Sequence, residues 1–402
     1  MVSKRLYYDD SYAAEFEAEV VERTDYQGKT AVILSQSLFY PTSGGQPHDT
    51  GFLNQTAVSN VIVRKEDEAV LHILDGKLDS DQVSGKVDWQ RRLDHMQQHT
   101  GQHILSQAFI QVADAATVSF HLSPESVTID LDKKSLTDEE IAQTEQLANQ
   151  IIWENRPIHV RMVSIEEAKT MNLRKLPPVR TGKLRLIDIE NFDLTACGGT
   201  HVTQTGGVGM IKIIKQERRK NKLRIEFRCG GRALADYGHK NDVALQLGSE
   251  LTTGLDQLLP SVQRLRDQLK EANRQIKQQQ AALMAAQAKQ LLAMAERMGE
   301  TAVVTHILES GSPNELQTLG QQLLGVGETA VCFLGLAGQR SHLLFCRTED
   351  APGNMGQLIK IAQAELGGGG GGRPERAQGG GPAASVDQIA QAITIAKQNI
   401  HP

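Results

Sequence analysis

Three histidines recur at every fourth position in the segment DHMQQHTGQH, which spans residues 94–103. They are His95, His99 and His103. At 3.6 residues per turn, side chains four positions apart lie one above the other on the same face of a helix. Two neutral imidazoles one turn apart can both bind zinc, at about 2.0–2.1 Å per nitrogen. The spacing therefore indicates half of a metal site, and the alternative is a helix whose histidines face water or one another.

A second pair of metal-binding side chains lies in the segment ACGGTHV, where Cys197 and His201 are again four positions apart. The two glycines between them would let the backbone turn tightly around a metal ion. One thiolate and three imidazoles form a ligand set that suits zinc. The two segments together predict a zinc site made of His99, His103, Cys197 and His201. His103 is preferred as a ligand because it leads directly into the apolar stretch ILSQAFIQV, which would anchor the helix.

The number of protein ligands leaves the role of the zinc open. Four protein ligands are usual in a closed structural site, whereas a catalytic zinc keeps one position for water. His95 could replace a ligand, orient one through a hydrogen bond, or lie on the surface. A zinc peptidase with the HExxH motif is excluded, because Thr100 and Gly101 follow His99 and no glutamate base is present there.

The composition indicates a soluble multidomain protein. A chain of 402 residues with 40% hydrophobic residues and a formal net charge of -5 is expected to form two to four domains. Its four cysteines do not form a disulfide framework, which fits a reducing cytosol. The first residues contain no apolar signal-peptide core, and no apolar run is long enough to span a bilayer. We expect a cytoplasmic protein.

The order of patterns along the chain predicts an α+β fold in four parts. Residues 1–90 read as strands and turns of a small β-barrel. Residues 91–240 mix helices with mainly antiparallel strands, and one helix is expected to begin at Thr137, with Glu140 completing a capping box. Residues 241–300 read as a helical, coiled-coil-like linker, and residues 301–402 alternate helix and strand.

The predicted linker is one long polar helix from about Asp242 to Gly299. Its apolar positions are spaced by three and four residues, as in a heptad seam. The seam consists of Val262, Leu265, Leu269, Ala272, Ile276, Gln279, Leu283 and Ala286. A coiled-coil hairpin, a dimer arm and packing against its own domain all remain open.

Three motifs carry a resemblance to a known family. HTGQH followed by CGGTHV resembles the second additional domain of alanyl- and threonyl-tRNA synthetases. FYPTSGGQPHDTG, which contains Gly44 and Gly45, looks like the glycine motif that precedes this domain in alanyl-type proteins. GGGGGGRPERAQGGG looks like the glycine-rich signature of the DHHA1 domain at the alanyl synthetase C-terminus. Their order resembles that of the free-standing, long-form alanyl-tRNA editing proteins, over nearly the whole chain.

This resemblance implies a trans-editing hydrolase that removes serine, and in some members glycine, from wrongly charged tRNA(Ala). It implies that His99, His103, Cys197 and His201 bind Zn²⁺, and that 91–240 is the editing domain. The chain starts at the editing region, so we expect deacylation without aminoacylation. The family's C-terminal domain assists tRNA binding and oligomerisation, so this region could form a homodimer. The alternative is a non-catalytic tRNA-binding protein in which zinc only holds the fold.

The residue that recognises the substrate amino acid is less clearly marked. The family places a polar residue about twenty positions after the first motif histidine, where this chain reads TVSFH. If this segment is a strand, Thr117, Ser119 and His121 share one face. We expect Ser119 or Thr117 to bind the seryl hydroxyl, and the alternative is a solvated strand face.

Two basic clusters are candidates for binding the tRNA backbone. The first lies at an expected hairpin tip and consists of Arg218, Arg219, Lys220 and Lys222. The second precedes the CxxxH segment and consists of Arg174, Lys175, Arg180 and Lys183. The alternative for the hairpin tip is that its charges are merely solvated.

Overall fold

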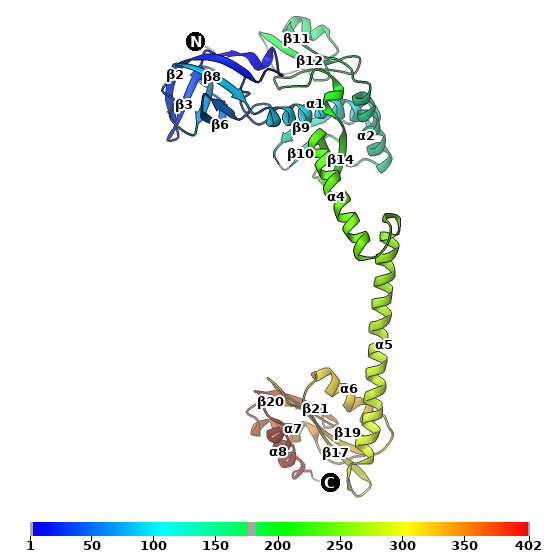
Figure 1. Ribbon diagram of the computed structural model, residues 1–402. Helices are drawn as coiled ribbons and strands as arrows, with labels where there is room; N and C mark the ends of the chain where they lie inside the picture. The colour runs from blue at the N-terminus through cyan, green and yellow to red at the C-terminus, as the bar shows by residue number, and fades with distance from the viewer. Residues whose placement is uncertain (1–2, 125, 176–181, 401–402) are drawn as a thin grey trace. The chain divides into compact units, whose positions relative to one another are not determined.

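The computed structural model describes residues 3–124, 126–175 and 182–400. The chain forms two compact units, Met1–Leu247 and Gly248–Pro402 (Figure 1). Among the described helices, none is both long enough and apolar enough to cross a membrane.

A closed six-stranded barrel opens the first unit, with strand order β2-β3-β7-β6-β5-β8. In β8, buried and exposed residues alternate, because successive side chains point into and out of the barrel. The interior contains Phe16, Phe39, Leu53 and Val70. The strands are β2 (Glu15–Tyr26), β3 (Lys29–Leu34), β5 (Gly51–Leu53), β6 (Thr56–Val63), β7 (Val70–Leu74) and β8 (Gln82–Val87). The predicted N-terminal barrel is confirmed.

The histidine segment lies in helix α1 (Trp89–Ala113), which follows the barrel directly. The Asp88 side chain caps the helix by accepting a hydrogen bond from the Arg91 backbone N–H. Gly101 lies where α1 touches strand β15 (Lys222–Cys229), and a Cβ at this position would lie 2.2 Å from Cys229 Sγ. A glycine is therefore needed inside this helix for the close approach of α1 to the sheet.

Two antiparallel sheets and two further helices complete the part of the first unit that surrounds α1. One sheet has the order β14-β15-β10-β9 and the other β11-β12-β13. Helix α2 begins with the predicted Thr137–Glu140 capping box. The remaining elements are β9 (Thr117–Leu122), β10 (Val127–Leu131), α2 (Asp138–Trp153), β11 (Ile158–Ser164), α3 (Ile165–Thr170), β12 (Lys183–Ile189), β13 (Asp193–Ala196) and β14 (Ile211–Arg219). The predicted mixture of helices with antiparallel strands is confirmed.

The prediction of one helix from Asp242 to Gly299 is wrong. Helix α4 (Gly230–Glu250) begins earlier and ends in a turn, and α5 (Leu258–Ala293) starts after it. The turn contains Thr252 in the left-handed region (φ 50°), a conformation that cannot continue a right-handed helix. The seam residues Leu269 and Leu283 on α5 are 64% and 70% exposed. A coiled-coil partner for them remains a prediction.

The rest of the second unit is a six-stranded sheet, β16-β17-β18-β19-β21-β20, with three helices. Part of the six-glycine run forms β20 (Gly369–Gly372), which pairs with β21 (Arg376–Gly381). The other elements are β16 (Glu296–Met298), β17 (Thr301–Leu308), α6 (Pro313–Leu324), β18 (Ala330–Leu336), β19 (Ser341–Arg347), α7 (Met355–Glu365) and α8 (Val386–Lys397). The predicted alternation of helix and strand is confirmed, and the assignment of this part to the DHHA1 type remains a prediction.

Candidate metal centre

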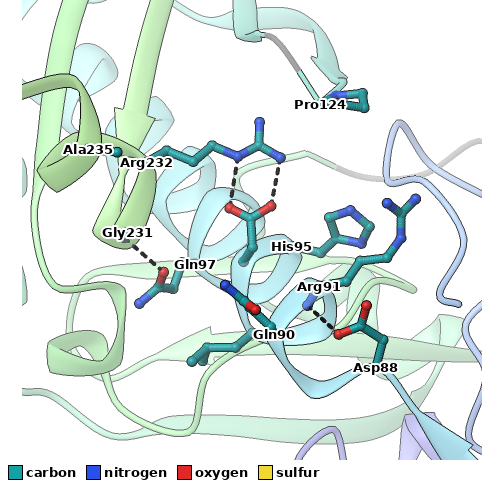
Figure 2. Close-up of a pocket in the computed structure, with 11 residues that line it drawn as sticks. Asp88, Gln90, Arg91, His95, Gln97, Pro124, Gly231, Arg232 and Ala235 are labelled. Atoms are coloured by element: carbon teal, nitrogen blue, oxygen red, sulfur yellow. Dashed lines mark hydrogen bonds and ion pairs between the residues drawn. The ribbon is translucent and has the colours of Figure 1, made fainter. Parts of the chain in front are cut away.

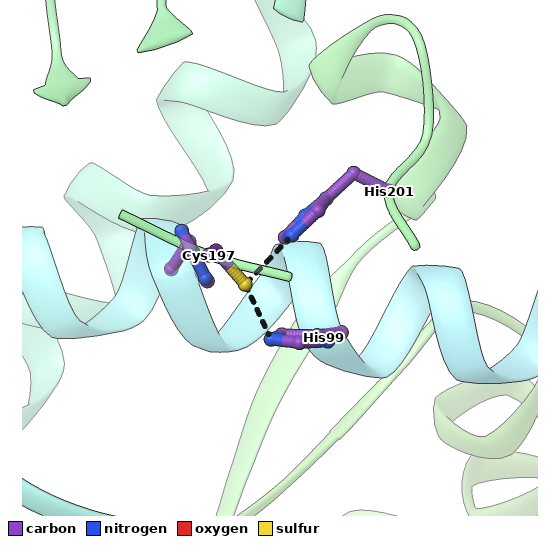
Figure 3. Close-up of side chains that lie close together, drawn as sticks. His99, Cys197 and His201 are labelled. Atoms are coloured by element: carbon purple, nitrogen blue, oxygen red, sulfur yellow. Dashed lines mark hydrogen bonds between the residues drawn. The ribbon is translucent and has the colours of Figure 1, made fainter. Parts of the chain in front are cut away.

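The two predicted halves of the metal site come together at α1 and the loop that follows β13. His99, His103, Cys197 and His201 each offer one ligand atom, and these atoms all lie within 4.8 Å of one another. Cys197 Sγ is 3.4 Å from the Nε2 atoms of both His99 and His201 (Figure 3). Three nitrogens and one sulfur at this separation fit a tetrahedral zinc ion.

The ring of His99 is oriented by Gln46, a fully buried side chain from the glycine motif. Gln46 Oε1 lies 2.8 Å from His99 Nδ1 and also accepts a hydrogen bond from the Thr200 backbone N–H. Gln46 Nε2 donates to the Thr200 hydroxyl, which fixes the amide orientation. Because Oε1 can only accept, His99 Nδ1 must carry the hydrogen, and the lone pair on Nε2 faces the centre.

His103 and His201 each have a neighbouring side chain at Nδ1, the ring nitrogen that is not needed as a metal ligand. Such a neighbour is called an outer partner. His103 Nδ1 lies 3.5 Å from the Asp193 carboxylate, and His201 Nδ1 lies 3.1 Å from the Thr100 hydroxyl. Thr100 Oγ1 also accepts a hydrogen bond from the Val202 backbone N–H. The Thr100 hydroxyl on Nδ1 fixes the orientation of the His201 ring and leaves its Nε2 for a metal ion. The Asp193 carboxylate is near His103 Nδ1 at ion-pair distance, without a hydrogen bond between them.

Arg174 belongs to this outer layer and is not a free phosphate-binding cation, so that prediction is wrong. Its Nε and Nη2 atoms bind the two Asp193 oxygens at 2.8 and 3.2 Å. Burial alone would raise the pKa of Asp193, but His103 and Arg174 together lower it. Asp193 therefore stays ionised beside His103 and raises the basicity of that imidazole.

Cys197 lies in an environment that favours its thiolate. Burial alone would raise the pKa of its thiol, but the three imidazoles lower it well below its usual range. The thiolate is the form that binds metals. Arg185 Nη1 donates to the carbonyl oxygens of Cys197 and Gly199 at 2.9 Å each, which fixes the loop. At Gly199 a Cβ would lie 2.1 Å from His99 Cε1, so this position has room only for glycine.

Gln46 directly follows a tight turn formed by two glycines of the glycine motif. Gly44 and Gly45 adopt φ values of 58° and 86°, which glycine reaches without strain. The Gly45 carbonyl accepts a hydrogen bond from the backbone N–H of Leu122 in β9. The neighbouring Phe120 ring stacks on His99 with ring centroids 5.3 Å apart. Sequence reasoning missed Gln46, although it directly follows the two glycines of the motif.

Thr117, Ser119 and His121 do not share one face, so that prediction is wrong. The register between β9 and β10 shifts between Asp130 and Leu131, and this irregularity changes the alternation of side chains. Ser119 donates a hydrogen bond to Asp130 at 2.8 Å. The Thr117 hydroxyl instead lies 2.7 Å from the hydroxyl of Ser106 on α1. Of the two candidates for substrate recognition, Thr117 is therefore the one beside the metal-centre helix.

Apart from Arg174, the predicted tRNA-binding cations that the structure describes are exposed. Arg218, Arg219 and Lys222 are exposed at the hairpin between β14 and β15, and Lys220 forms its tip with φ 53°. Lys183 is exposed at the start of β12. Arg180 lies outside the described residues. Binding of tRNA by these side chains remains a prediction.

Replacing Gln46 by alanine is expected to weaken zinc binding by about 10–100-fold, because His99 loses the partner that fixes its tautomer. A competition titration with a chromophoric chelator measures this change. Gln55→Ala, in an exposed turn of the barrel, is the matched control. Equal zinc affinities for the two variants would show that Gln46 does not position the ligand.

Comparison with known proteins links the site to tRNA synthetases. Residues 184–226 match the threonyl and alanyl tRNA synthetase second additional domain, and residues 3–91 match the class II (A) tRNA synthetases. The chain is 31% identical to the alanine–tRNA ligase of Pyrococcus furiosus over 94% of its own length but only 42% of the ligase. It thus spans less than half of the length of that relative.

Two relatives of similar length identify the family. The alanyl-tRNA editing protein AlaX-L of Pyrococcus horikoshii is 30% identical over 94% of both chains. The alanyl-tRNA editing protein Aarsd1-A of Xenopus laevis is 34% identical over 65% of this chain and 67% of that protein. The chain belongs to the alanyl-tRNA editing protein family.

Proposed function

We propose that this chain hydrolyses the ester that joins a wrong amino acid to the terminal ribose of tRNA(Ala), with the help of zinc. Serine is the chief amino acid removed and glycine is a second one. The observation that carries the proposal is the set of three imidazoles and one thiolate, each imidazole with its own outer partner. The names of the editing relatives support the choice of tRNA(Ala).

The metal centre accounts for the hydrolytic chemistry. A zinc ion there would act as a Lewis acid and lower the pKa of water towards about 7. His99, His103, His201 and Cys197 would hold it, and the Phe120 ring beside His99 excludes solvent from one side of that imidazole.

Thr117 accounts for the preference for serine. Gln102 Nε2 on α1 donates to Ser106 Oγ at 2.7 Å, and Ser106 Oγ is 2.7 Å from Thr117 Oγ1. Ser106 can then donate to Thr117 and leave the Thr117 hydroxyl free to donate to the seryl hydroxyl. An alanyl substrate would leave this group unpaired, at a cost of about 1–3 kcal/mol. A second, hydrolytic site is needed because an alanine-binding pocket rejects the slightly larger serine poorly.

The full-length protein is expected to deacylate seryl-tRNA(Ala) about 5- to 150-fold faster than alanyl-tRNA(Ala), which is the cost of one such unpaired group expressed as a ratio of rates. Initial rates with seryl-, glycyl- and alanyl-tRNA(Ala) measure the preference. Thr117→Val should remove most of the discrimination, and Ser119→Ala, which alters the side chain bound to Asp130, should retain it.

Two outcomes would contradict the proposal in different ways. Equal loss of discrimination in both variants would remove Thr117 from its assigned role. Folded, zinc-loaded protein that hydrolyses none of the three substrates would favour the second candidate, a tRNA-binding protein with a structural zinc. The four protein ligands of the cluster are the observation that favours this alternative.

Neutralising the exposed hairpin between β14 and β15 is expected to weaken tRNA binding and flatten its salt dependence. For every phosphate that the protein no longer neutralises, the slope of log K against log salt becomes shallower by about 0.7–0.9. The triple variant Arg218→Gln, Arg219→Gln, Lys220→Gln is compared with wild type by titration at several salt concentrations. An unchanged slope would exclude this hairpin from the tRNA interface.

A further inference from the structure

A cavity lies beside the first turns of α1, in the same unit as the metal centre. Its volume is about 670 Å³, within the range of roughly 300–1,000 Å³ that is usual for small-molecule sites. Its walls come from the start of α1, the start of α4 and the loop after β9 (Figure 2). They include Asp88, Gln90, Arg91, His95, Pro124 and Arg232.

His95 is the buried polar group in this wall. Its side chain is 3% exposed, and among the described residues its Nδ1 atom has no hydrogen-bond partner. Leaving a buried polar atom without a hydrogen-bond partner is unfavourable, so this nitrogen is available to a ligand. Burial, helped by Arg91, lowers the pKa of His95 to about 3. The ring is therefore neutral at pH 7 and can accept or donate a hydrogen bond.

The charges around the cavity favour an anion near Arg91. Helices α1 and α4 both begin here, and helix N-termini carry partial positive charge. Arg91 donates through Nε to the His48 carbonyl at 3.0 Å, and within the described parts of the chain it forms no ion pair. The two carboxylates of the wall are engaged. Asp88 caps α1, and Asp94 forms a two-point ion pair with Arg232.

We propose that this cavity binds a nucleotide of the single-stranded 3′ end of tRNA, next to the nucleotide that carries the amino acid. The phosphate lies at Arg91 and the N-terminus of α4, and the base lies against His95 and Pro124. Unpaired RNA bases are commonly recognised by hydrogen bonds to their exposed edges, and His95 Nδ1 offers such a bond. The assignment rests on the proposed deacylase function and names the part of the substrate that this surface would hold.

The position of the cavity along α1 supports this assignment. His95 and His99 are one turn apart on the same face of the helix, which is a rise of about 6 Å. An RNA end that follows this face can therefore place its last ribose at the metal centre while the preceding nucleotide occupies the cavity. This also gives His95 a role separate from the four clustered ligands.

Filling the cavity tests the proposal without removing any polar side chain. Ala235 is exposed on α4 and lines the cavity, so Ala235→Trp would occupy the proposed nucleotide position. Leu234→Trp is the matched control, because Leu234 is its neighbour on α4, is 67% exposed and is not part of the wall. The probe is a short oligoribonucleotide with the 3′-terminal sequence of tRNA(Ala), titrated against the full chain.

Ala235→Trp is expected to weaken oligoribonucleotide binding at least about tenfold, because the indole occupies the space of the nucleotide and keeps its phosphate from Arg91. It should also raise KM for seryl-tRNA(Ala) more than it lowers kcat. Arg91→Gln should weaken binding similarly and reduce the salt slope by about 0.7, the value for one neutralised phosphate of a single strand. Leu234→Trp should bind like wild type.

The outcomes separate this proposal from the proposed function. Unchanged oligoribonucleotide binding in both Ala235→Trp and Arg91→Gln would overturn the nucleotide site, even if the chain deacylates seryl-tRNA(Ala). Weakened binding in both, in a chain that hydrolyses no aminoacyl-tRNA, would support the site and contradict the deacylase. Adenosine monophosphate that binds as tightly as the oligoribonucleotide would overturn the assignment to an RNA end.

Discussion

Cys197→Ala is expected to abolish stoichiometric zinc binding and to slow deacylation of seryl-tRNA(Ala) by at least about a hundredfold. This loss of rate is larger than the loss that usually follows removal of a residue that only orients a metal ligand. Cys197 supplies the only anionic ligand of the cluster, and its thiol pKa is already lowered by the three imidazoles. His103→Ala should have a similar effect, because it also leaves the buried Asp193 carboxylate without its imidazole. Metal analysis and single-turnover deacylation measure the two effects.

The control for this experiment is a second buried cysteine. Cys346→Ala makes the same chemical change in β19, in the second unit. It should retain zinc and activity. A Cys197→Ala protein with wild-type zinc content and an unchanged deacylation rate would contradict the assignment of Cys197 as a ligand.

Arg92→Ala is expected to lower the free energy of unfolding by about 3–5 kcal/mol, because it leaves a buried carboxylate unpaired. Arg92 and Asp49 are both fully buried, and their closest atoms, Nη2 and Oδ2, are 2.5 Å apart. Arg92 also donates to the carbonyl oxygens of Ser11 and Leu38. These bonds join the metal-centre helix to the glycine motif, through Asp49, and to two segments that precede this motif, through Ser11 and Leu38. Urea unfolding of the full chain, followed through the transition of the first unit, measures the loss.

Two comparisons show whether this loss comes from the buried pair. Arg23→Ala removes an exposed ion pair with Asp81 and hydrogen bonds to the carbonyl oxygens of residues 78–80 in the same unit. It leaves no buried charge unpaired and should therefore cost less than Arg92→Ala. The double variant Arg92→Met, Asp49→Leu should recover much of the stability, because neither charge remains buried alone. An Arg92→Ala protein no less stable than Arg23→Ala would show that the pair does not hold α1 to the barrel.

The four clustered ligands could be predicted because each pair is local in the sequence. In HxxxH on a helix and in CxxxH in a glycine-containing loop, two ligands lie within a few residues of each other and can reach the same metal ion. The barrel could be predicted for a similar reason, since alternating burial along a strand such as β8 appears directly in the residue types.

The outer partners could not be predicted, because they depend on interactions between distant segments. Gln46 and His99 are 53 positions apart, and Gln46 and Thr200 are 154 positions apart. No local pattern indicates that a glutamine after two glycines will reach an imidazole. For the same reason the sequence alone could not show that Arg174 pairs with Asp193, because only the fold brings the two side chains together.

The two structural errors came from single-residue irregularities. Because the register shifts once along β9, Thr117 lies on the face opposite to the one that strict alternation predicts. One left-handed residue, Thr252, divided the long polar segment into α4 and α5. A single irregular residue hardly changes the periodicity of a whole segment, so such residues are identified only in the folded chain.

X-ray absorption at the zinc edge of the purified full-length chain is the most direct measurement. We expect one zinc per chain, bound by three imidazole nitrogens at about 2.0–2.1 Å and one sulfur at about 2.3 Å. A metal-free chain that folds and deacylates normally, or a zinc shell without sulfur, would contradict the convergence of α1 and the Cys197 loop on a single ion.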